Sequence, residues 1–100
     1  MTEKEILEKI EKKDTEYFAN IYDNQRQNIS VVYDQNYGDG NDYIVCLHFE
    51  LLNIYVLLIG TYSSWDSTEW ASASIAEPFE HIETRYKPIS IKKYLKNKGE

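Results

Sequence analysis

The sequence predicts an α+β fold in which an N-terminal helix packs on an antiparallel sheet of about four or five strands, followed by a short C-terminal helix. Apolar residues recur at helical spacing over about the first 23 residues. Alternating apolar residues separated by turn signals fill the middle of the chain, and helical spacing returns near the C-terminus. The length of 100 residues is that of one domain, so we expect residues 1–100 to form a single unit.

The first element is a helix that begins at a capping box. Residues 2–5 are Thr-Glu-Lys-Glu, so the Thr2 hydroxyl can accept a hydrogen bond from a backbone N–H while Glu5 reaches back. Apolar residues then keep a spacing of three to four as far as residue 22, although Asp14 interrupts the pattern. We favour one kinked helix to about residue 23. Two consecutive short helices are the alternative.

Two alternating stretches predict a β-hairpin. Residues 28–34 carry Ile29, Val31 and Tyr33 on one face, and residues 43–49 place their odd-numbered and even-numbered side chains on opposite faces. The segment between them contains two glycines with Asp and Asn, which supply the positive φ angles that a turn needs.

The next strand is apolar on both faces. Residues 54–59 are Ile-Tyr-Val-Leu-Leu-Ile, which predicts a central strand covered by the helix on one side and by something else on the other. Residues 70–75 are ambiguous. Residues 79–86 alternate well enough to predict a strand that begins after Pro78 and ends at Lys87-Pro88.

The C-terminal segment predicts a short helix. Ser90 can act as its N-cap, lysines follow towards its C-terminus, and Gly99 occupies the C′ position. A final strand over residues 89–95 is the alternative, because Ile89 and Ile91 also alternate.

The net charge of −6 is unevenly divided along the chain. Residues 14–86 hold twelve acids and two arginines, a net charge of −10, whereas residues 87–100 hold five lysines and one glutamate, a net charge of +4. A body of this charge is repelled by phosphates and attracted by basic surfaces, including the grooves in which other proteins hold nucleic acid. We therefore expect a protein partner with a basic surface and no direct contact with nucleic acid. Ordinary solubility is the alternative explanation.

The sequence offers no catalytic or metal-binding motif. Cys46 and His48 lie two apart on one strand, about 6–7 Å from each other, which is too far for a direct hydrogen bond. The two histidines have no metal-ligand spacing. We expect no enzymatic activity, no metal and no cofactor. A single cysteine and no long apolar run also predict a cytoplasmic protein that does not enter membranes.

The segment from Tyr62 to Trp70 has the composition of a protein-binding loop. Its Tyr and Trp residues offer large rigid contact areas, and its Ser and Thr residues offer adaptable hydrogen bonds. The alternative is that Trp65 and Trp70 fold back to close one end of a small core, and one tryptophan could serve each purpose.

Three short patterns carry a resemblance to known proteins. The loop YGDGNDY at residues 37–43, the apolar strand that leads into GTYSSWD at residues 60–66, and the acid-rich strand after it resemble small proteins of bacteriophages and other mobile elements, over roughly residues 30–88. The resemblance implies an inhibitor of host defence, such as an anti-CRISPR protein that occupies a basic nucleic-acid groove, or an immunity protein against a nuclease toxin. It implies action in the cytoplasm of a bacterial host and no catalytic residues.

We therefore expect a small acidic protein that binds and inhibits a defence or nucleic-acid-handling enzyme. A protein that binds a small molecule such as a nucleotide signal, and a structural protein that forms a homodimer through an unpaired sheet edge, are the alternatives. Acids that pair with Arg or Lys and aromatic anchors make up the candidate contacts. They are Tyr37, Asp39, Asp42, Trp65, Asp66, Glu69 and Trp70.

Overall fold

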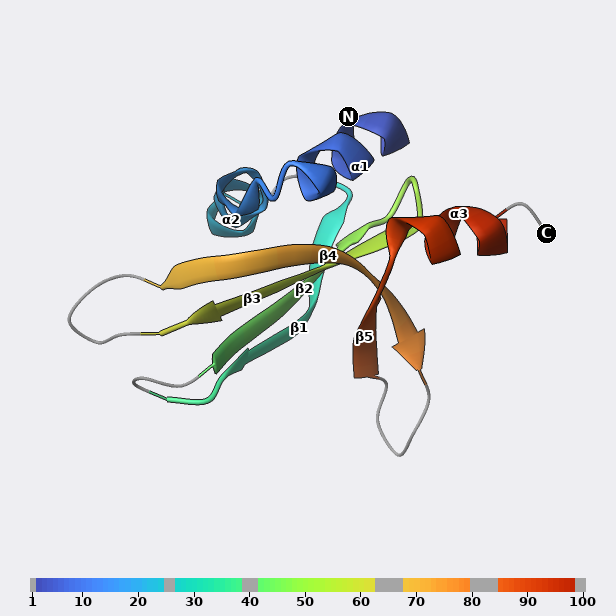
Figure 1. Cartoon of the computed structure of the whole chain (residues 1–100). Helices are drawn as coiled ribbons and strands as arrows, with labels where there is room; N and C mark the ends of the chain where they lie inside the picture. The colour runs from blue at the N-terminus through green and yellow to red at the C-terminus, as the bar shows by residue number, and fades with distance from the viewer. Residues whose placement is uncertain (1, 25–26, 39–41, 63–67, 80–84, 99–100) are drawn as a thin grey trace.

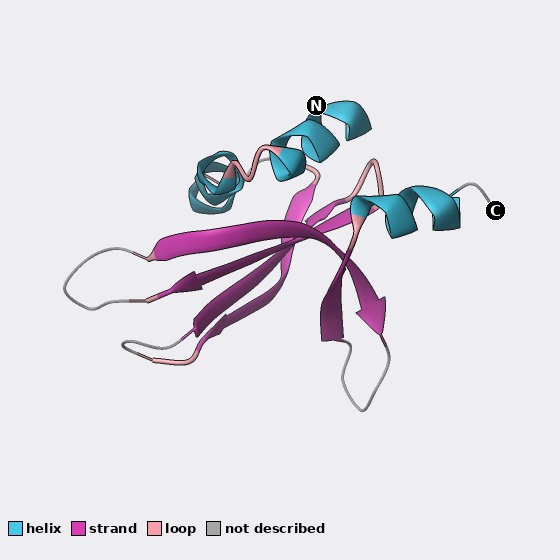
Figure 2. Ribbon diagram, viewed as in Figure 1, coloured by secondary structure: helices cyan, strands magenta, loops and turns pink. Residues whose placement is uncertain are grey.

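A computed structural model describes all of the chain except residues 1, 25–26, 39–41, 63–67, 80–84 and 99–100. In order, its elements are α1 (Glu3–Glu11), α2 (Thr15–Asp23), β1 (Ile29–Asn36), β2 (Asp42–Phe49), β3 (Ile54–Thr61), β4 (Glu69–Phe79), β5 (Arg85–Ile89) and α3 (Ile91–Lys98). Each strand pairs antiparallel with the next, so the sheet order is β1-β2-β3-β4-β5. The helices lie on one side of the sheet (Figures 1 and 2). The α+β prediction is confirmed.

The N-terminal segment forms two helices, so the favoured single kinked helix is wrong and the alternative is correct. The Thr2 side chain accepts a hydrogen bond from the Glu5 N–H at 3.2 Å and caps α1 as expected. Lys13 then adopts a left-handed backbone with a φ of 57°. The Asp14 carboxylate accepts from the Tyr17 N–H at 3.2 Å and starts α2. The chain therefore ends one helix and caps another within three residues.

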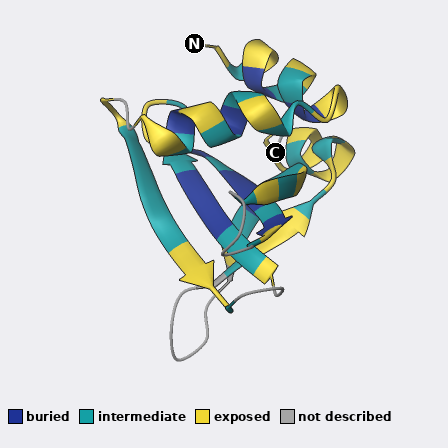
Figure 3. Cartoon of the chain, turned by 90° about the vertical axis from the view of Figure 1, so that its left-hand side faces the viewer, coloured by how far each residue is buried: buried dark blue, intermediate teal, exposed yellow. Residues whose placement is uncertain are grey.

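The core lies between the helices and one face of the sheet. Phe18 of α2 is fully buried, and the edge of its ring meets Phe49 of β2 at a centroid distance of 6.3 Å. Figure 3 shows the buried segments of the central strands beneath the helices. The buried residues of this cluster are Ile6, Ile10, Phe18, Ile21, Val45, Leu47, Phe49, Ile54, Val56, Leu58 and Ile75.

A β-bulge in β1 overturns one predicted face. The register between β1 and β2 shifts between Val31 and Tyr33. Ile29 and Val31 contact the helix-side core, whereas Tyr33 contacts the opposite face. The prediction that all three share a face is wrong for Tyr33, because the extra residue at the bulge reverses the alternation.

Proline does not limit the strands in the way the sequence suggested. The strand β4 continues through Pro78, which pairs with Tyr86, and Pro88 lies within β5 rather than after it. Pro78 lies beyond Ala76, the last residue of β4 that pairs with β3, and β5 is an edge strand. Both prolines thus occupy positions where a missing N–H costs little. The predicted strand over residues 79–86 is wrong, and its residues 80–84 lie outside the described part of the chain.

The two ends of the described chain are tied together. The Ser90 hydroxyl accepts from the Lys93 N–H at 3.1 Å, which caps α3 and confirms the C-terminal helix. The Tyr94 hydroxyl donates to the Glu3 carboxylate at 2.9 Å, and Lys98 forms an ion pair with the same carboxylate. Hydrogen bonds from Lys98 and Tyr94 lower the pKa of Glu3 below its ordinary value of 4.5. The ionised form of Glu3 therefore stabilises the contact between α1 and α3.

We expect Glu3→Gln to reduce the free energy of unfolding by about 0.5 kcal/mol at neutral pH, as for other exposed ion pairs. Because the pKa of Glu3 is lowered in the folded state, its contribution is complete above pH 4.5 and is lost as the pH falls through that lower value. Urea denaturation of both proteins at pH 7 and at about pH 3 checks this. The difference should be smaller at the lower pH. A pH-independent difference, or an equal effect of the exposed control Glu11→Gln, would contradict it.

Gly60 lies where β3 passes close to β4. A Cβ atom at this position would lie 2.5 Å from the carbonyl oxygen of Glu69 and 2.9 Å from the Cα of Trp70. We expect Gly60→Ala to destabilise the fold by about 1–3 kcal/mol, since the two strands must move apart. Thermal or urea denaturation measures this. The exposed change Ser72→Ala on the same strand pair should alter stability by less than about 0.5 kcal/mol.

Candidate functional site

The face of the sheet opposite the helices is built of uncharged residues everywhere but at its hairpin end. We call it the open face, because no helix of the described chain lies over it (Figures 1 and 2). Strand alternation and the observed register place sixteen uncharged residues on its central part. They are Ser30, Val32, Tyr33 and Gln35, Ile44, Cys46 and His48, Tyr55, Leu57 and Ile59, Ser72, Ser74, Ala76 and Pro78, and Tyr86 and Pro88. In a chain of net charge −6, none of them carries a formal charge at pH 7 when histidine is neutral.

Tyrosine side chains partly cover the middle of the open face. Cys46 is fully buried, and Leu57 and Ala76 are 4% exposed. Tyr55 and Tyr86 pack against this centre, and their ring centroids are 5.3 Å apart. Aromatic side chains are long enough to reach over a neighbouring strand, so they shield residues that no second layer of backbone covers.

His48 is held by local contacts at one end of this face. Its ring stacks on Tyr55 at a centroid distance of 4.2 Å and an interplanar angle of 4°. Its Nε2 atom lies 3.0 Å from Oδ1 of Asn53. These contacts fix the orientation of the His48 ring beside the tyrosines.

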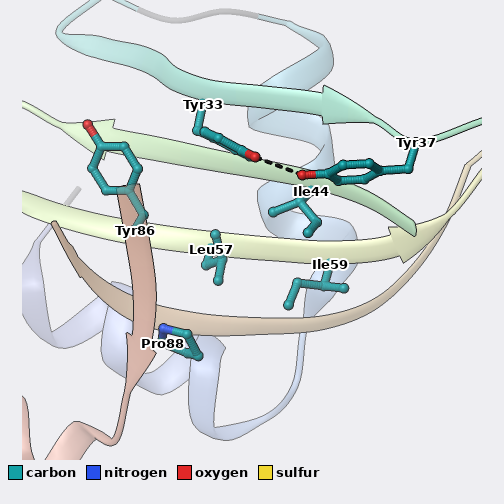
Figure 4. Close-up of a pocket in the computed structure, with 7 residues that line it drawn as sticks. All are labelled: Tyr33, Tyr37, Ile44, Leu57, Ile59, Tyr86 and Pro88. Atoms are coloured by element: carbon teal, nitrogen blue, oxygen red, sulfur yellow. Dashed lines mark hydrogen bonds between the residues drawn. The ribbon is translucent and has the colours of Figure 1, made fainter. Parts of the chain in front are cut away.

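A cavity of about 300 Å³ lies in the open face (Figure 4). Its floor consists of three aliphatic side chains from β2 and β3, and tyrosine and proline side chains surround them. Tyr33 and Tyr37 point towards each other, with their hydroxyl oxygens 2.9 Å apart. The lining residues are Tyr33, Tyr37, Ile44, Leu57, Ile59, Tyr86 and Pro88. A volume of this size is at the small end of the range for ligand sites.

Two carboxylates border the cavity at the hairpin end of the sheet. Asp42 pairs with Thr61, and Thr61 pairs with Glu69, so the three residues form one row across β2, β3 and β4. Asp42 precedes Ile44 by two residues and Thr61 follows Ile59 by two, which puts this row about 7 Å beyond the cavity floor on the same face. The Tyr37 N–H donates to the Asp42 carbonyl oxygen at 3.0 Å, joining the tyrosine wall to the acidic row.

The structure brings together three of the residues predicted to contact a partner. Tyr37, 51% exposed, lines the cavity, and Asp42 and Glu69 are exposed beside it. Trp70 is half-buried on the helix side, where its ring lies 6.1 Å from Tyr22 and 5.3 Å from Tyr43 between centroids. Trp70 therefore closes one end of the core, which is the alternative role given above for the tryptophans. The predicted contacts Asp39, Trp65 and Asp66 lie outside the described residues.

Four exposed acids gather near the hairpin end of the sheet, and the lysines of β5 and α3 lie away from them. We call Asp23, Asp34, Asp42 and Glu69 the acidic end; the first two act electrostatically on Tyr43. None of the four ion pairs between described residues includes these acids. The lysines of β5 and α3 are at the other end, where Lys87 and Lys93 both pair with Glu77. These two groups are therefore separate in space, whereas acids and lysines are mixed along α1.

A tyrosine pair lies under the acidic end. The Tyr22 hydroxyl donates to Asp34 at 2.6 Å and lies 2.8 Å from the Tyr43 hydroxyl. Burial and the hydrogen bond to Asp34 raise the pKa of Tyr22 far above its ordinary value. The phenol therefore stays protonated and donates to Asp34 at every physiological pH.

The described cysteine, Cys46, is a free and buried thiol. Burial raises the pKa of the Cys46 thiol to about 12, which makes it a poor nucleophile. No group of three or more His, Cys, Asp or Glu side chains in the described part of the chain could hold a metal ion. No described helix is long and apolar enough to cross a membrane.

Comparisons with family models, curated proteins and solved structures gave no match, so function has to be inferred from the chain's own geometry. Sequence reasoning did not name the open face as a contact surface; of the residues that line its cavity it named Tyr37. The signal for it was present in the apolar character of both faces of residues 54–59. It was also present in the small residues Ser72, Ser74 and Ala76, which recur every second position along β4 and leave space above the sheet.

Cys46 should react with a thiol reagent only when the protein unfolds. Its side chain is fully buried and its pKa is about 12, so the thiolate is scarce and inaccessible in the folded state. We expect labelling by Ellman's reagent at pH 8 to be more than about 100-fold slower in buffer than in concentrated urea. Fast labelling of the folded protein would show that the tyrosine cover of the open face opens readily.

Proposed function

We propose that this protein is a non-enzymatic binding protein that docks on another protein through its open face and inhibits it. The observation that carries the proposal is a tyrosine-rich sheet face with an uncharged centre and no covering layer in the described structure. Tyrosine is enriched at protein interfaces, and charged residues are depleted at their centres. A large apolar surface on a soluble protein indicates an interaction site.

The size of the open face suits an interface of ordinary extent. Five strands spaced by about 4.8 Å and up to eight residues of about 3.3 Å each give an area of roughly 600 Å². Stable protein complexes bury about 800 Å² on each partner, so the open face together with the acidic row has nearly the area of a complete interface.

The acidic row indicates which partners would be preferred. Asp42 and Glu69 stand exposed beside the cavity, and no described lysine pairs with either of them. Carboxylates in this position attract a surface rich in Arg or Lys and repel the phosphates of nucleic acid. We therefore propose as target an enzyme with a basic nucleic-acid-binding surface, such as a nuclease or a defence effector, met in the cytoplasm of a bacterial host.

The cavity supports a small molecule less well than a protein. Its described lining contains no Lys or Arg, so a nucleotide bound there would have no cation for its phosphates. A ligand for it has to be apolar and neutral in the part that enters.

The test is inhibition of DNA cleavage by a panel of purified nucleases and CRISPR effector complexes. We expect the wild-type protein to inhibit at least one of them, and Ile59→Glu on the open face to weaken that inhibition about tenfold or more, because it buries a charge in the interface. The matched control is Leu95→Glu, a 47% exposed leucine on α3, which should inhibit like the wild type.

Charge-reversal variants distinguish the effect of the acidic row on inhibition from the effect of net charge. The double variant Asp42→Lys, Glu69→Lys should lose inhibition, whereas Glu8→Lys, Glu11→Lys on exposed positions of α1 makes the same change in net charge and should keep it. Failure to inhibit any enzyme of the panel, or inhibition that survives both open-face and acidic-row variants, would overturn the proposal. So would a wild-type dimer that Ile59→Glu converts to a monomer, since a second copy would then cover the face.

A further inference from the structure

The open-face cavity and the acidic row form one composite site. Ile44 and Ile59 lie on the cavity floor, and the residues two positions towards the hairpin end on the same strands are Asp42 and Thr61. Residues two apart on a strand share a face and are about 7 Å apart. An apolar depression thus ends about 7 Å from a row that carries carboxylates on both of its outer strands.

The cavity has the size and lining of a pocket for a single large side chain. The aliphatic floor offers dispersion contacts, and the walls from Tyr33 and Tyr37 on one side and Tyr86 and Pro88 on the other present ring faces and edges (Figure 4). About 300 Å³ is the lower limit for sites that hold a whole ligand. An aromatic or large aliphatic side chain fits this description better than an extended molecule does.

The acidic row suits a cation that approaches between two strands. Asp42 and Glu69 are separated by two strand spacings, about 10 Å between their Cα atoms, with the short Thr61 side chain between them. Carboxylates at that separation can approach one guanidinium or ammonium group from both sides. Neither acid takes part in an ion pair between described residues, so this charge is available to a partner.

We propose that this composite site binds a short extended segment of the partner protein, with an aromatic or large aliphatic residue in the cavity and a Lys or Arg two residues away at Asp42 and Glu69. An extended segment presents residues i and i+2 on the same side about 7 Å apart, which matches the separation of the cavity floor from the acidic row. The inference rests on the proposed function and names the part of the partner that is recognised.

The test uses the full chain and three synthetic peptides. Protein labelled at the Ile and Leu methyl groups is titrated with acetyl-Ser-Trp-Gly-Arg-Ser-amide, with the peptide that has Glu in place of Arg, and with the peptide that has Gly in place of Trp. We expect the first peptide to shift the methyl signals of Ile44, Leu57 and Ile59 in a saturable way. Those of Ile6, buried under α1, should stay in place. The Glu peptide should bind at least about tenfold more weakly, and the Gly peptide should not shift these signals.

Variants of the site separate its two parts. Asp42→Asn with Glu69→Gln should abolish the preference for the Arg peptide over the Glu peptide, whereas Glu8→Gln with Glu11→Gln should leave that preference unchanged. Ile44→Trp, which fills the cavity, should abolish the shifts. If that variant fails to fold, the comparison of the two charge variants still decides the question.

The outcomes distinguish this inference from the proposed function. Shifts at other methyl groups, equal affinity for the Arg and Glu peptides, or no saturable shift at all would overturn the composite site. If that happens while Ile59→Glu still relieves inhibition of DNA cleavage, the open face binds its partner without such a segment. If the Arg peptide binds as expected and no enzyme is inhibited, the composite site stands and the target class is wrong.

Discussion

The strand β3 must be shielded from water on both of its faces, and the rest of the structure depends on this. Ile54, Val56 and Leu58 face the helices, and Tyr55, Leu57 and Ile59 face the other way. Two short helices and α3 cover the first set. In the described part of the chain the second set is covered by side chains of the sheet itself, Tyr33 and Tyr86 among them, and this incomplete cover leaves the cavity and the uncharged surface around it. The function is therefore inferred from the second face of the sheet, over which the described structure has no helix.

The regular parts of the fold follow from local signals in the sequence. The Thr2 and Ser90 caps, the antiparallel pairing of β1 with β2, and the alternation of residues 43–49 each depend on residues close in sequence, and all were predicted. The break after α1 was visible as an interruption at Asp14. The sequence did not show that this interruption is strong enough to separate two helices, because helical spacing of the apolar residues continues across it. The capping carboxylate of Asp14 and the left-handed backbone of Lys13 end the first helix.

The composition of the open face depends on features that a single sequence does not reveal. A one-residue bulge near Val32 turns Tyr33 from the core to the open face, and no propensity marks that position. Tyr86 and Pro88 join the cavity only because β4 continues through Pro78 and β5 pairs back on it. Of the predicted contacts, Tyr37, Asp42 and Glu69 lie together because adjacent strands end at one edge. Trp70 is turned to the other side of the sheet by alternation and by the register shift next to Gly60.

The bond network from Glu3 to Tyr94 and Lys98 links residues 91 and 95 positions apart in a fold whose strands all pair with their neighbours in sequence. Pairing of strands that are neighbours in sequence costs little loop entropy, whereas the contact between α1 and α3 closes nearly the whole chain into one loop. Residues near the two ends of the described chain are thus in contact. Its ends could be joined and reopened in another loop without crossing the open face.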